Sequence, residues 1–394
     1  MPRRSLPGLS LSAPRTSFCM PVSLLLSAGE ASGDMYAARL ATEIQKRLDV
    51  KIFGMGGAQM RAAGVDVVTD YSEVSVVGIT EIVSHLPSLI RAMRKLVGEA
   101  RRRRPALAML TDFPGFHLRL ARKLKPLGIT NVYYVCPQFW AWRPWRVRIV
   151  RRRFAKALCI FPFEKDFYGN AGVPTEFIGH PLVGMVSATL TRAEFAQKHG
   201  IAARRIVALL PGSRLGEIGR HLPTMLAACA ELHKTKREIA FVIAVAPGVE
   251  LSQIHRLVSM SGVCAVVVQD ETYDALAAAD VALVCSGTAT IEAALLDVPM
   301  AVVYRVTALT AMLAKPLVRT KFFSMVNLIA GRRVVAELIQ DDFTPQSAAH
   351  ELQRLLDSEP ARNELRRGLA EVREKLGPPG AVARAADAIV TLLK

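Results

Sequence analysis

Short apolar runs recur along this 394-residue chain and alternate with segments whose apolar residues have helical spacing. Runs of this length and separation are typical of parallel β-strands joined by crossover helices. The first half places such strands at 22–27, 51–54, 106–111, 131–136, 157–161 and 176–178. The second half places them at 206–210, 239–244, 264–268, 281–285 and 300–304. The alternation therefore predicts an α/β fold.

The two sets of strands predict two Rossmann-like lobes with a cleft between them, followed by C-terminal helices. A chain of this length can form two domains of ordinary size. We expect an N-terminal lobe over 20–185, a C-terminal lobe over 200–345, and helices over 346–394. Ligands of such sheets bind at the carboxyl ends of strands, so the loops that follow strands are the candidates for a site.

Residues 1–19 are basic and contain no acidic residue. They lack the apolar run of a secretory signal, so we expect a disordered leader, with a transit peptide or a misassigned start before Met20 as alternatives.

Mean hydropathy is +0.26, yet no run of about 18 uncharged apolar residues occurs. The cysteines show no CxxC spacing, which favours buried free thiols in a reducing compartment.

Positive charge is concentrated in one part of the chain. Between Arg91 and Lys156, 18 Lys and Arg face two acidic residues, a net of +16 out of +17 for the whole protein. Such a span favours an anionic partner, either phospholipid headgroups, a phosphorylated substrate or nucleic acid. A solvated basic face without a partner is the alternative. No nucleic-acid-binding motif is present, so we expect no nucleic acid among the partners.

Two loops of the second half have the composition of a nucleotide site. The sequence PGSR (211–214) joins a strand to a helix, where backbone N–H groups and Arg214 can hold phosphate oxygens. The small residues of SGTAT (286–290) admit a diphosphate to the backbone, and Glu292 can accept hydrogen bonds from ribose hydroxyls. The alternative is a helix-capping loop in which the helix dipole favours Glu292.

The first half carries its own loop after the first strand. Two glycines in AGEASGD (28–34) permit a tight turn into a helix. We expect this loop to contact a sugar or to close over the diphosphate; the alternative is turn chemistry with Ser32 as the helix N-cap. The residues of this predicted cleft loop are Gly29, Glu30, Ser32, Gly33 and Asp34.

The sequence TDFPGF (111–116) places an acid directly after a buried strand, between apolar neighbours. Poor solvation raises the proton affinity of a carboxyl group and suits a general base. We therefore predict Asp112 as the catalytic residue, with a helix-capping aspartate as the alternative. The histidines form no HxH or HxxxH cluster, so we predict no metal site.

All three tryptophans lie between 137 and 146, interleaved with arginines. This combination is typical of a membrane–water interface or a lipid-phosphate site. Apolar residues at helical spacing over 76–90 predict a second membrane-facing element, with an ordinary core helix as the alternative. The predicted acceptor or membrane contacts are Trp140, Trp142, Arg143, Trp145 and Arg146.

Taken together, several segments resemble lipid-A-disaccharide synthase, a family of GT-B-fold glycosyltransferases of lipid A and lipopolysaccharide biosynthesis. The resemblance covers residues 20 to 394. The segments are SAGEASGD (27–34), VVGITEIV (76–83), LTDFPGFH (110–117), YYVCPQFWAWRPWRV (133–147), FPFEKDFY (161–168), FIGHPLV (177–183), LLPGSRLGEI (209–218), SGTATIEAAL (286–295) and VNLIAGRRVVAELIQ (326–340).

The resemblance implies an inverting hexosyltransferase that joins UDP-2,3-diacylglucosamine to 2,3-diacylglucosamine 1-phosphate (lipid X), forming a β-1,6 linkage and releasing UDP. Asp112 would deprotonate the acceptor 6-hydroxyl. It also implies that no metal or other cofactor is needed, since the UDP-sugar is a substrate. The residues implied for the donor and its UDP are Ser213, Arg214, Ser286, Gly287, Thr288, Glu292, Asn327 and Gln340.

The resemblance further implies a cytoplasmic protein on the inner face of the inner membrane, in contact with anionic phospholipids, and a homodimer in some members. One position departs from the family pattern: His117 stands where Asn is usual, and it could keep a hydrogen bond or titrate. Two alternatives remain open. Another UDP-sugar enzyme of this fold, such as an epimerase, would not need the Trp/Arg loop, and a non-catalytic membrane-binding protein would not need Asp112.

Overall fold

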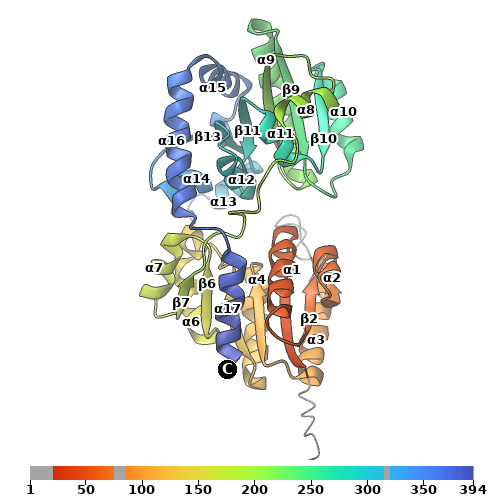
Figure 1. Ribbon diagram of the computed structural model, residues 1–394, viewed down its shortest axis with the longest axis vertical. Coiled ribbons are helices and arrows are strands. Elements are labelled where there is room, and N and C mark those ends of the chain that lie inside the picture. The colour runs from red at the N-terminus through yellow and green to blue at the C-terminus, as the bar shows by residue number, and fades with distance from the viewer. Residues whose placement is uncertain (1–20, 75–85, 315–319, 394) are drawn as a thin grey trace, which may run out of the picture.

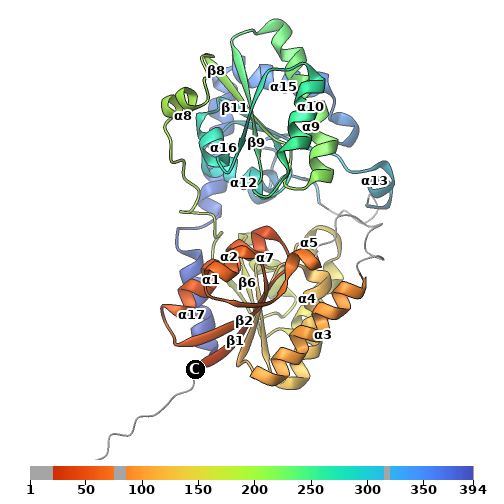
Figure 2. The same ribbon diagram turned by 90° about the vertical axis from the view of Figure 1, so that its right-hand side faces the viewer.

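The computed structural model describes residues 21–74, 86–314 and 320–393, which form two lobes (Figure 1 and Figure 2). The first lobe contains a parallel sheet with the strand order β3-β2-β1-β4-β5-β6-β7. Its strands are β1 (Val22–Ala28), β2 (Val50–Gly56), β3 (Asp66–Asp70), β4 (Leu107–Thr111), β5 (Thr130–Tyr134), β6 (Lys156–Cys159) and β7 (Thr175–Phe177). The helices of this lobe are α1 (Ala31–Gln45), α2 (Ala58–Ala62), α3 (Leu86–Arg103), α4 (Pro114–Leu124), α5 (Phe139–Trp142), α6 (Val147–Arg153) and α7 (Pro162–Asn170).

The second lobe contains another parallel sheet, in the order β10-β9-β8-β11-β12-β13. Its strands are β8 (Arg205–Leu210), β9 (Ile239–Val245), β10 (Ala265–Gln269), β11 (Val281–Cys285), β12 (Met300–Tyr304) and β13 (Ala336–Ile339). Its helices are α8 (Arg192–Lys198), α9 (Leu215–Thr235), α10 (Leu251–Ser261), α11 (Thr272–Ala278), α12 (Thr288–Leu295), α13 (Ala308–Ala314) and α14 (Met325–Ala330). The predicted α/β fold with two lobes is confirmed.

The central strands are apolar because both of their faces are covered. In the first lobe, Leu24 and Leu26 of β1 pack with α1, whereas Leu25 belongs to the cluster formed with α3, α4 and α6. All residues of β4 and β11 are buried. The carboxyl ends of these strands are therefore held rigidly, and the loops that follow them have fixed positions.

The C-terminal helices are divided between the lobes. Helices α15 (Pro345–Asp357) and α16 (Glu359–Lys375) pack on the second lobe, whereas α17 (Ala381–Leu393) returns to the first lobe and packs on α1 (Figure 1). Where the chain crosses back, the Arg384 guanidinium donates to the carbonyl oxygens of Ile178, Pro378 and Pro379 at 2.7–2.9 Å. The chain thus connects the lobes twice, and the two crossings are bonded to each other.

Several short elements were not predicted from the sequence, among them β3, β13 and α8, which lies between the ranges expected for the two lobes. The leader and residues 76–83 of the predicted membrane-facing face lie outside the described residues. Of that face, Leu86 and Ile90 are exposed in α3, and Leu89 packs against the core.

Cys264 is exposed, so the prediction of a buried thiol is wrong there. No helix in the described ranges is long and apolar enough to cross a bilayer.

Candidate active site

Each sheet has one position where its strand order reverses, and ligands of doubly wound folds bind there. In the first sheet this position lies between β1 and β4, and in the second between β8 and β11. The loops that follow these four strands, 29–30, 112–113, 211–214 and 286–287, are the loops predicted from the sequence. They meet across the boundary between the lobes, where Arg214 Nη2 lies 3.0 Å from Glu30 Oε2.

Asp112 occupies the turn between β4 and α4. Asp112 and Phe113 both have positive φ angles, 55° and 44°, a left-handed conformation that costs a residue with a side chain about 1–2 kcal/mol. Phe113 occupies the N-cap position of α4 and no side chain caps that helix, so the alternative role of Asp112 as a helix cap is wrong. The strained turn instead leaves the half-buried Asp112 at the carboxyl edge of the sheet.

Two buried side chains hold the carbonyl of Asp112 in this turn. His117 Nδ1 lies 2.7 Å from the oxygen, and Tyr133 donates its hydroxyl to it at 3.0 Å. Because a carbonyl only accepts hydrogen bonds, Nδ1 carries the proton and Nε2 accepts from Ser27 Oγ at 2.8 Å. Burial lowers the pKa of His117 to about 4. The residue that departs from the family pattern is therefore neutral and holds the backbone of Asp112.

The electrostatic environment of Asp112 is that of a base for neutral pH. Burial is the main reason why its pKa is raised to about 7, and the Glu30 carboxylate raises it further. The Phe113 N–H and the Arg214 guanidinium act in the opposite direction. A carboxyl group that titrates near neutrality can both exist as the anion and accept a proton from an alcohol during reaction.

The loop 211–214 presents donors at the start of α9. Gly212 has φ 125°, and a Cβ there would lie 2.9 Å from Glu217 Cβ, so only glycine fits. Ser213 N–H donates to Glu217 Oε2 at 3.3 Å, and Arg214 Nη1 lies 3.4 Å from Glu217 Oε1. The backbone and guanidinium donors of this loop thus face carboxylate oxygens, which are the kind of anionic atoms that a phosphate presents.

The loop 286–287 leads into α12 at Thr288. Gly287 has φ 148° and open space around the position of a Cβ, so a ligand can approach its backbone. Ser286 Oγ donates to Phe323 O at 2.9 Å. Glu292 lies beyond the first turn of α12, where burial raises its pKa and Tyr273 donates to it at 3.1 Å. The hydrogen bond from Tyr273 therefore fixes the orientation of the Glu292 carboxylate.

Asn327 and Gln340 are engaged within the second lobe. Asn327 is fully buried; its Oδ1 accepts from the N–H groups of 334 and 335, and its Nδ2 donates to Glu337 at 2.9 Å. Gln340 Oε1 accepts from Val306 N–H at 2.7 Å. Both side chains support neighbouring loops here, and direct contact of either with the donor stays a prediction.

The cleft loop of the first lobe has two parts with different environments. Helix α1 begins at Ala31 with Glu30 at its N-cap position, so the alternative role of Ser32 as the N-cap is wrong. A Cβ on Gly29 would lie 2.3 Å from the Phe113 ring. The beginning of the loop therefore packs tightly against the turn that holds Asp112.

Asp34 lies in the second part of the same segment and is buried. Its carboxylate accepts from the N–H groups of Gly57, Gln59 and Met60 at 2.6–3.3 Å, which places it at the start of α2. A Cβ on Gly33 would lie 3.7 Å from Thr111 Cγ2, so the helix passes close to β4. Asp34 thus links α1 to the start of α2, and a contact of Asp34 with substrate stays a prediction.

The tryptophans of the aromatic loop divide into an inward and an outward group. Trp140 donates to Glu164 Oε1 at 3.3 Å. Trp142 and Trp145 instead stack with arginine: the Arg143 guanidinium lies 4.5 Å from the Trp142 ring, and that of Arg146 lies 5.6 Å from both rings. Trp145 is 59% exposed. The outward group is therefore the part of this loop that can meet a lipid or membrane surface.

Buried polar residues near the site were missed in the sequence. Glu164 is fully buried, accepts from the N–H groups of Ile160 and Phe161, and has its pKa raised to about 8, chiefly by burial. Tyr36 of α1 is buried, and the charges of Glu292 and Asp112 both raise its pKa after burial itself. Glu164 lies in the segment FPFEKDFY, where an acid among aromatic residues was the available signal. Tyr36 carried no comparable signal.

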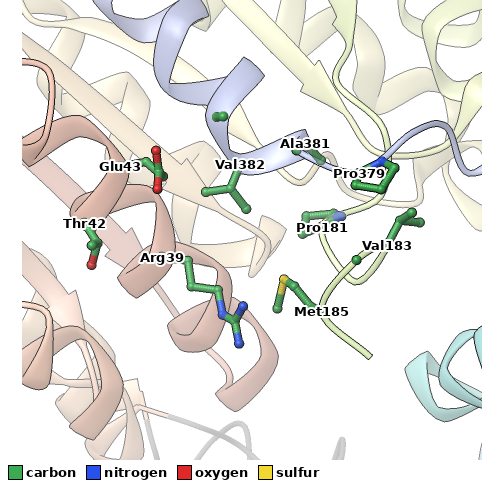
Figure 3. Close-up of a pocket in the computed structure, with 12 residues that line it drawn as sticks. Arg39, Thr42, Glu43, Pro181, Val183, Met185, Pro379, Ala381 and Val382 are labelled. Atoms are coloured by element: carbon green, nitrogen blue, oxygen red, sulfur yellow. The ribbon is translucent and has the colours of Figure 1, made fainter. Parts of the chain in front are cut away.

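A shallow pocket of about 320 Å³ lies where the chain crosses between the lobes (Figure 3). Arg39 and Glu43 of α1, Pro181, residues 183–185 and the beginning of α17 line it. None of the predicted site residues lines this pocket. In the described parts of the chain, no group of three or more His, Cys, Asp or Glu side chains is arranged to hold a metal ion.

Solved structures with the same fold have low sequence identity to this chain. A co-structure of S. aureus MnaA with UDP has a TM-score of 0.64 at 10% identity and covers 93% of this chain and 96% of that one. UDP-GlcNAc 2-epimerase from Neisseria meningitidis, bound to UDP-GlcNAc, has a TM-score of 0.58 at 11% identity, with 95% and 99% covered. Anabaena Alr3699/HepE in complex with UDP-glucose has a TM-score of 0.61 at 12% identity, with 94% and 99% covered. At this identity the likeness shows the fold alone.

Full-length relatives are far more similar. A family model described as "Lipid-A-disaccharide synthetase" matches residues 24–383. The lipid-A-disaccharide synthase of Solibacter usitatus (strain Ellin6076) is 46% identical over 375 residues, which cover 94% of this chain and 97% of that one. The enzyme of the same name from Myxococcus xanthus (strain DK1622) is 42% identical over 375 residues, with 95% and 98% covered. The chain therefore belongs to the lipid-A-disaccharide synthase family of glycosyltransferases.

Proposed function

We propose that this protein transfers a diacylglucosamine unit from UDP-2,3-diacylglucosamine to 2,3-diacylglucosamine 1-phosphate (lipid X), giving the β-1,6 disaccharide 1-phosphate and UDP. Family membership supports these substrates. One structural observation carries the reaction: Asp112, whose pKa is raised to about 7, stands at the carboxyl end of β4 opposite the Arg214 loop. In this proposal, the base and the anion-binding loop lie on the two sides of the lobe boundary.

In the proposed reaction, Asp112 takes the proton of the acceptor 6-hydroxyl while that oxygen attacks the anomeric carbon of the donor. The bond between this carbon and the β-phosphate oxygen breaks, and UDP leaves from the opposite face, so the anomeric configuration inverts. Arg214 and the backbone N–H groups of loop 211–214 stabilise the negative charge that develops on the leaving phosphate. We propose that this cation and these dipoles take the place of a metal ion.

The donor is proposed to lie over the switch point of the second sheet. Ser213, Ser286, Gly287 and Thr288 border the two loops there, and Glu292 follows within α12. The neighbours described as bound to UDP or to UDP-sugars share this fold, which supports a UDP-sugar as the donor. Glu292 is proposed to accept from the ribose hydroxyls in place of, or in addition to, Tyr273.

The acceptor and the membrane are proposed to meet the first lobe. Helices α3, α4 and α6 pack side by side over one face of its sheet, and α3 and α4 run along one side of the lobe in Figure 2. We define the basic face as the exposed cations of these helices, which are Arg91, Arg94, Lys95, Arg101, Arg102, Arg119, Arg122, Lys123, Arg148, Arg151 and Arg152. Their charge supports binding to anionic phospholipids at the inner face of the inner membrane. A homodimer is a further proposal that family membership supports.

Incubation of the purified protein with both lipid substrates tests the function. We expect the disaccharide 1-phosphate and UDP by mass spectrometry, and a β-anomeric linkage by NMR, with undiminished turnover in EDTA. Donor supplied without acceptor should yield little UDP. Conversion of UDP-GlcNAc to its 2-epimer would support the epimerase alternative, and vesicle binding without any product would support the non-catalytic one.

A further inference from the structure

Two carboxylates from different lobes hold Arg214. Its Nη2 lies 3.0 Å from Glu30 Oε2 of the first lobe, and its Nη1 lies 3.4 Å from Glu217 Oε1 in its own helix. Ser213 N–H donates to the other oxygen of Glu217 at 3.3 Å. The donors of loop 211–214 thus bind carboxylate oxygens in this conformation. A diphosphate that enters the loop must compete with these carboxylates for the guanidinium.

Glu30 also acts on Asp112. Its backbone is fixed by α1, because Asp34 N–H donates to Glu30 O at 2.8 Å. The preceding Gly29 packs against Phe113, the neighbour of Asp112. The Glu30 carboxylate therefore has two charged neighbours, Arg214, which it neutralises, and Asp112, whose pKa it raises.

The other groups around Asp112 either bond to its carbonyl or interact with its charge from elsewhere in the first lobe. His117 and Tyr133 bond to its carbonyl, as described above. Tyr36, Tyr133 and Glu164 interact with its charge from α1, β5 and α7 of the same lobe. Among the charged groups that act most strongly on Asp112, Glu30 and Arg214 are bonded to each other across the lobe boundary. A ligand that binds Arg214 therefore changes the effects of Glu30 and of Arg214 on the Asp112 carboxyl group together.

We propose that Glu30 couples donor binding to the catalytic base: it pairs with Arg214 across the lobes before the donor binds, and the donor diphosphate displaces it. This inference rests on the proposed function, since the diphosphate is that of the proposed donor. Once phosphate oxygens neutralise Arg214, the Glu30 carboxylate loses its cation but stays beside Asp112. Its negative charge then stabilises the protonated form of Asp112, which favours proton transfer from the acceptor when the donor is in place.

The Glu30→Gln variant tests this coupling through two measurements. UDP should bind about two- to five-fold more tightly by titration calorimetry, because an exposed ion pair worth up to about 1 kcal/mol no longer competes for Arg214. The acid limb of kcat, at saturating concentrations of both substrates, should move to lower pH by on the order of half a unit. Unchanged or weaker UDP binding overturns the proposal, and so does an acid limb that stays in place.

Two control variants separate contact from charge. Glu30→Asp keeps the negative charge but shortens the side chain, so UDP should bind more tightly while the acid limb stays near that of the wild type. Glu217→Gln removes the other carboxylate of Arg214, which is not among the charges that act on Asp112, so its acid limb should also stay in place. A displaced acid limb in either control overturns the proposal. UDP binding needs no turnover, so a wild type that forms no disaccharide refutes the proposed function and still leaves the ion pair open to this test.

Discussion

The turn at Asp112 depends on a chain of hydrogen bonds that begins at Ser27 and passes through His117. Both residues are fully buried, and the tautomer of His117 follows from the carbonyl that it must serve. Asp112 holds an unfavourable backbone conformation because these groups fix its carbonyl. His117 is thus a positioning residue, and its effect on the reaction passes through Asp112.

Replacing His117 by Ala should reduce both stability and turnover. The substitution leaves the Ser27 hydroxyl and the Asp112 carbonyl with fewer partners, which costs about 1–3 kcal/mol in the free energy of unfolding. A relaxed Asp112 turn should lower kcat by about ten-fold or more, with little effect on UDP binding. Denaturant unfolding and steady-state kinetics measure the two effects. His117→Asn, the residue usual in the family, should lose less of both; an Asn variant no better than Ala would contradict the positioning role.

The same residue predicts a pH dependence of stability. The pKa of His117 is lowered to about 4 in the folded protein, against about 6.5 in an unfolded chain. The unfolded state therefore takes up a proton first, so this contribution is complete above about pH 6.5 and is lost as the pH falls toward 4. His117→Ala should show a shallower loss of stability over this interval, measured by denaturation at several pH values.

The loops at the two switch points act as units whose shape depends on single glycines. Gly212 illustrates this, because its φ of 125° and its approach to Glu217 exclude a side chain. Loop 211–214 can present Ser213 N–H and Arg214 together only in that conformation. The proposed diphosphate contacts of the second lobe should therefore be more sensitive to backbone changes than to the loss of any one hydroxyl group.

Gly212→Ala should weaken UDP binding by about ten-fold or more, since the loop must leave the geometry that directs its donors. Calorimetric titration with UDP measures this effect. Gly219→Ala in α9 is a matched control, because a Cβ there would find its nearest neighbour at 3.9 Å, the end of the Gln253 side chain. Equal UDP affinity of the two variants would show that the loop shape is not needed for binding.

The sequence was sufficient to predict the central strands and the loops that follow them. These strands are buried on both faces and read as continuous apolar runs, as β4 and β11 do. The edge strands β3 and β13 escaped prediction because they are short and mostly half-buried. The partners of Asp34 could not be predicted either, since they belong to a segment more than 20 residues away. Those of Asn327 lie within 10 residues, but they depend on how the loop between α14 and β13 folds back.

The path of the C-terminal helices could not be derived from their pattern. The apolar stripe of α17 predicts a helix with one buried face, but it does not specify which of the two lobes that face packs on. The structure places α17 on α1, where Arg47 Nε lies 2.7 Å from Asp387 Oδ1. Contacts of this kind, and the bond from Arg384 to Ile178 O, join segments far apart in the sequence and cannot be derived from the apolar pattern of one helix.

The protein as a whole has an asymmetric charge distribution that agrees with a lipid reaction at a surface. The basic face lies on α3, α4 and α6 of the first lobe. Trp145 and its arginine neighbours, in the loop after β5, add aromatic and basic side chains to this lobe. A protein bound to a membrane through this face would keep the Asp112 turn on the membrane-bound lobe, which is the lobe proposed to receive the acceptor. The second lobe would then bring UDP from the aqueous side.

Binding to vesicles with phosphatidylglycerol should be strong at low salt and should fall as ionic strength rises, because surface charges are screened. Each basic residue near such a surface contributes about 1 kcal/mol, so the double variant Arg122→Glu, Lys123→Glu should bind markedly less. Sedimentation with vesicles measures this. The double variant Lys234→Glu, Arg256→Glu on the second lobe should bind like the wild type; equal losses in both variants would contradict a specific basic face.

The pH profile of kcat/KM and kcat for the wild type and for Asp112→Asn tests the central claim most directly. In the ligand-free protein the pKa of Asp112 is raised to about 7, and the base must be ionised, so wild-type kcat/KM should fall as the pH drops below about 7. The acid limb of kcat reports the substrate complex and should lie at this pH or higher. The Asn variant should lose about 10²- to 10⁴-fold in kcat and the acid limb with it, while its UDP affinity stays within about two-fold of the wild type. Near-normal turnover in the variant, or an acid limb that persists in it, would contradict Asp112 as the base.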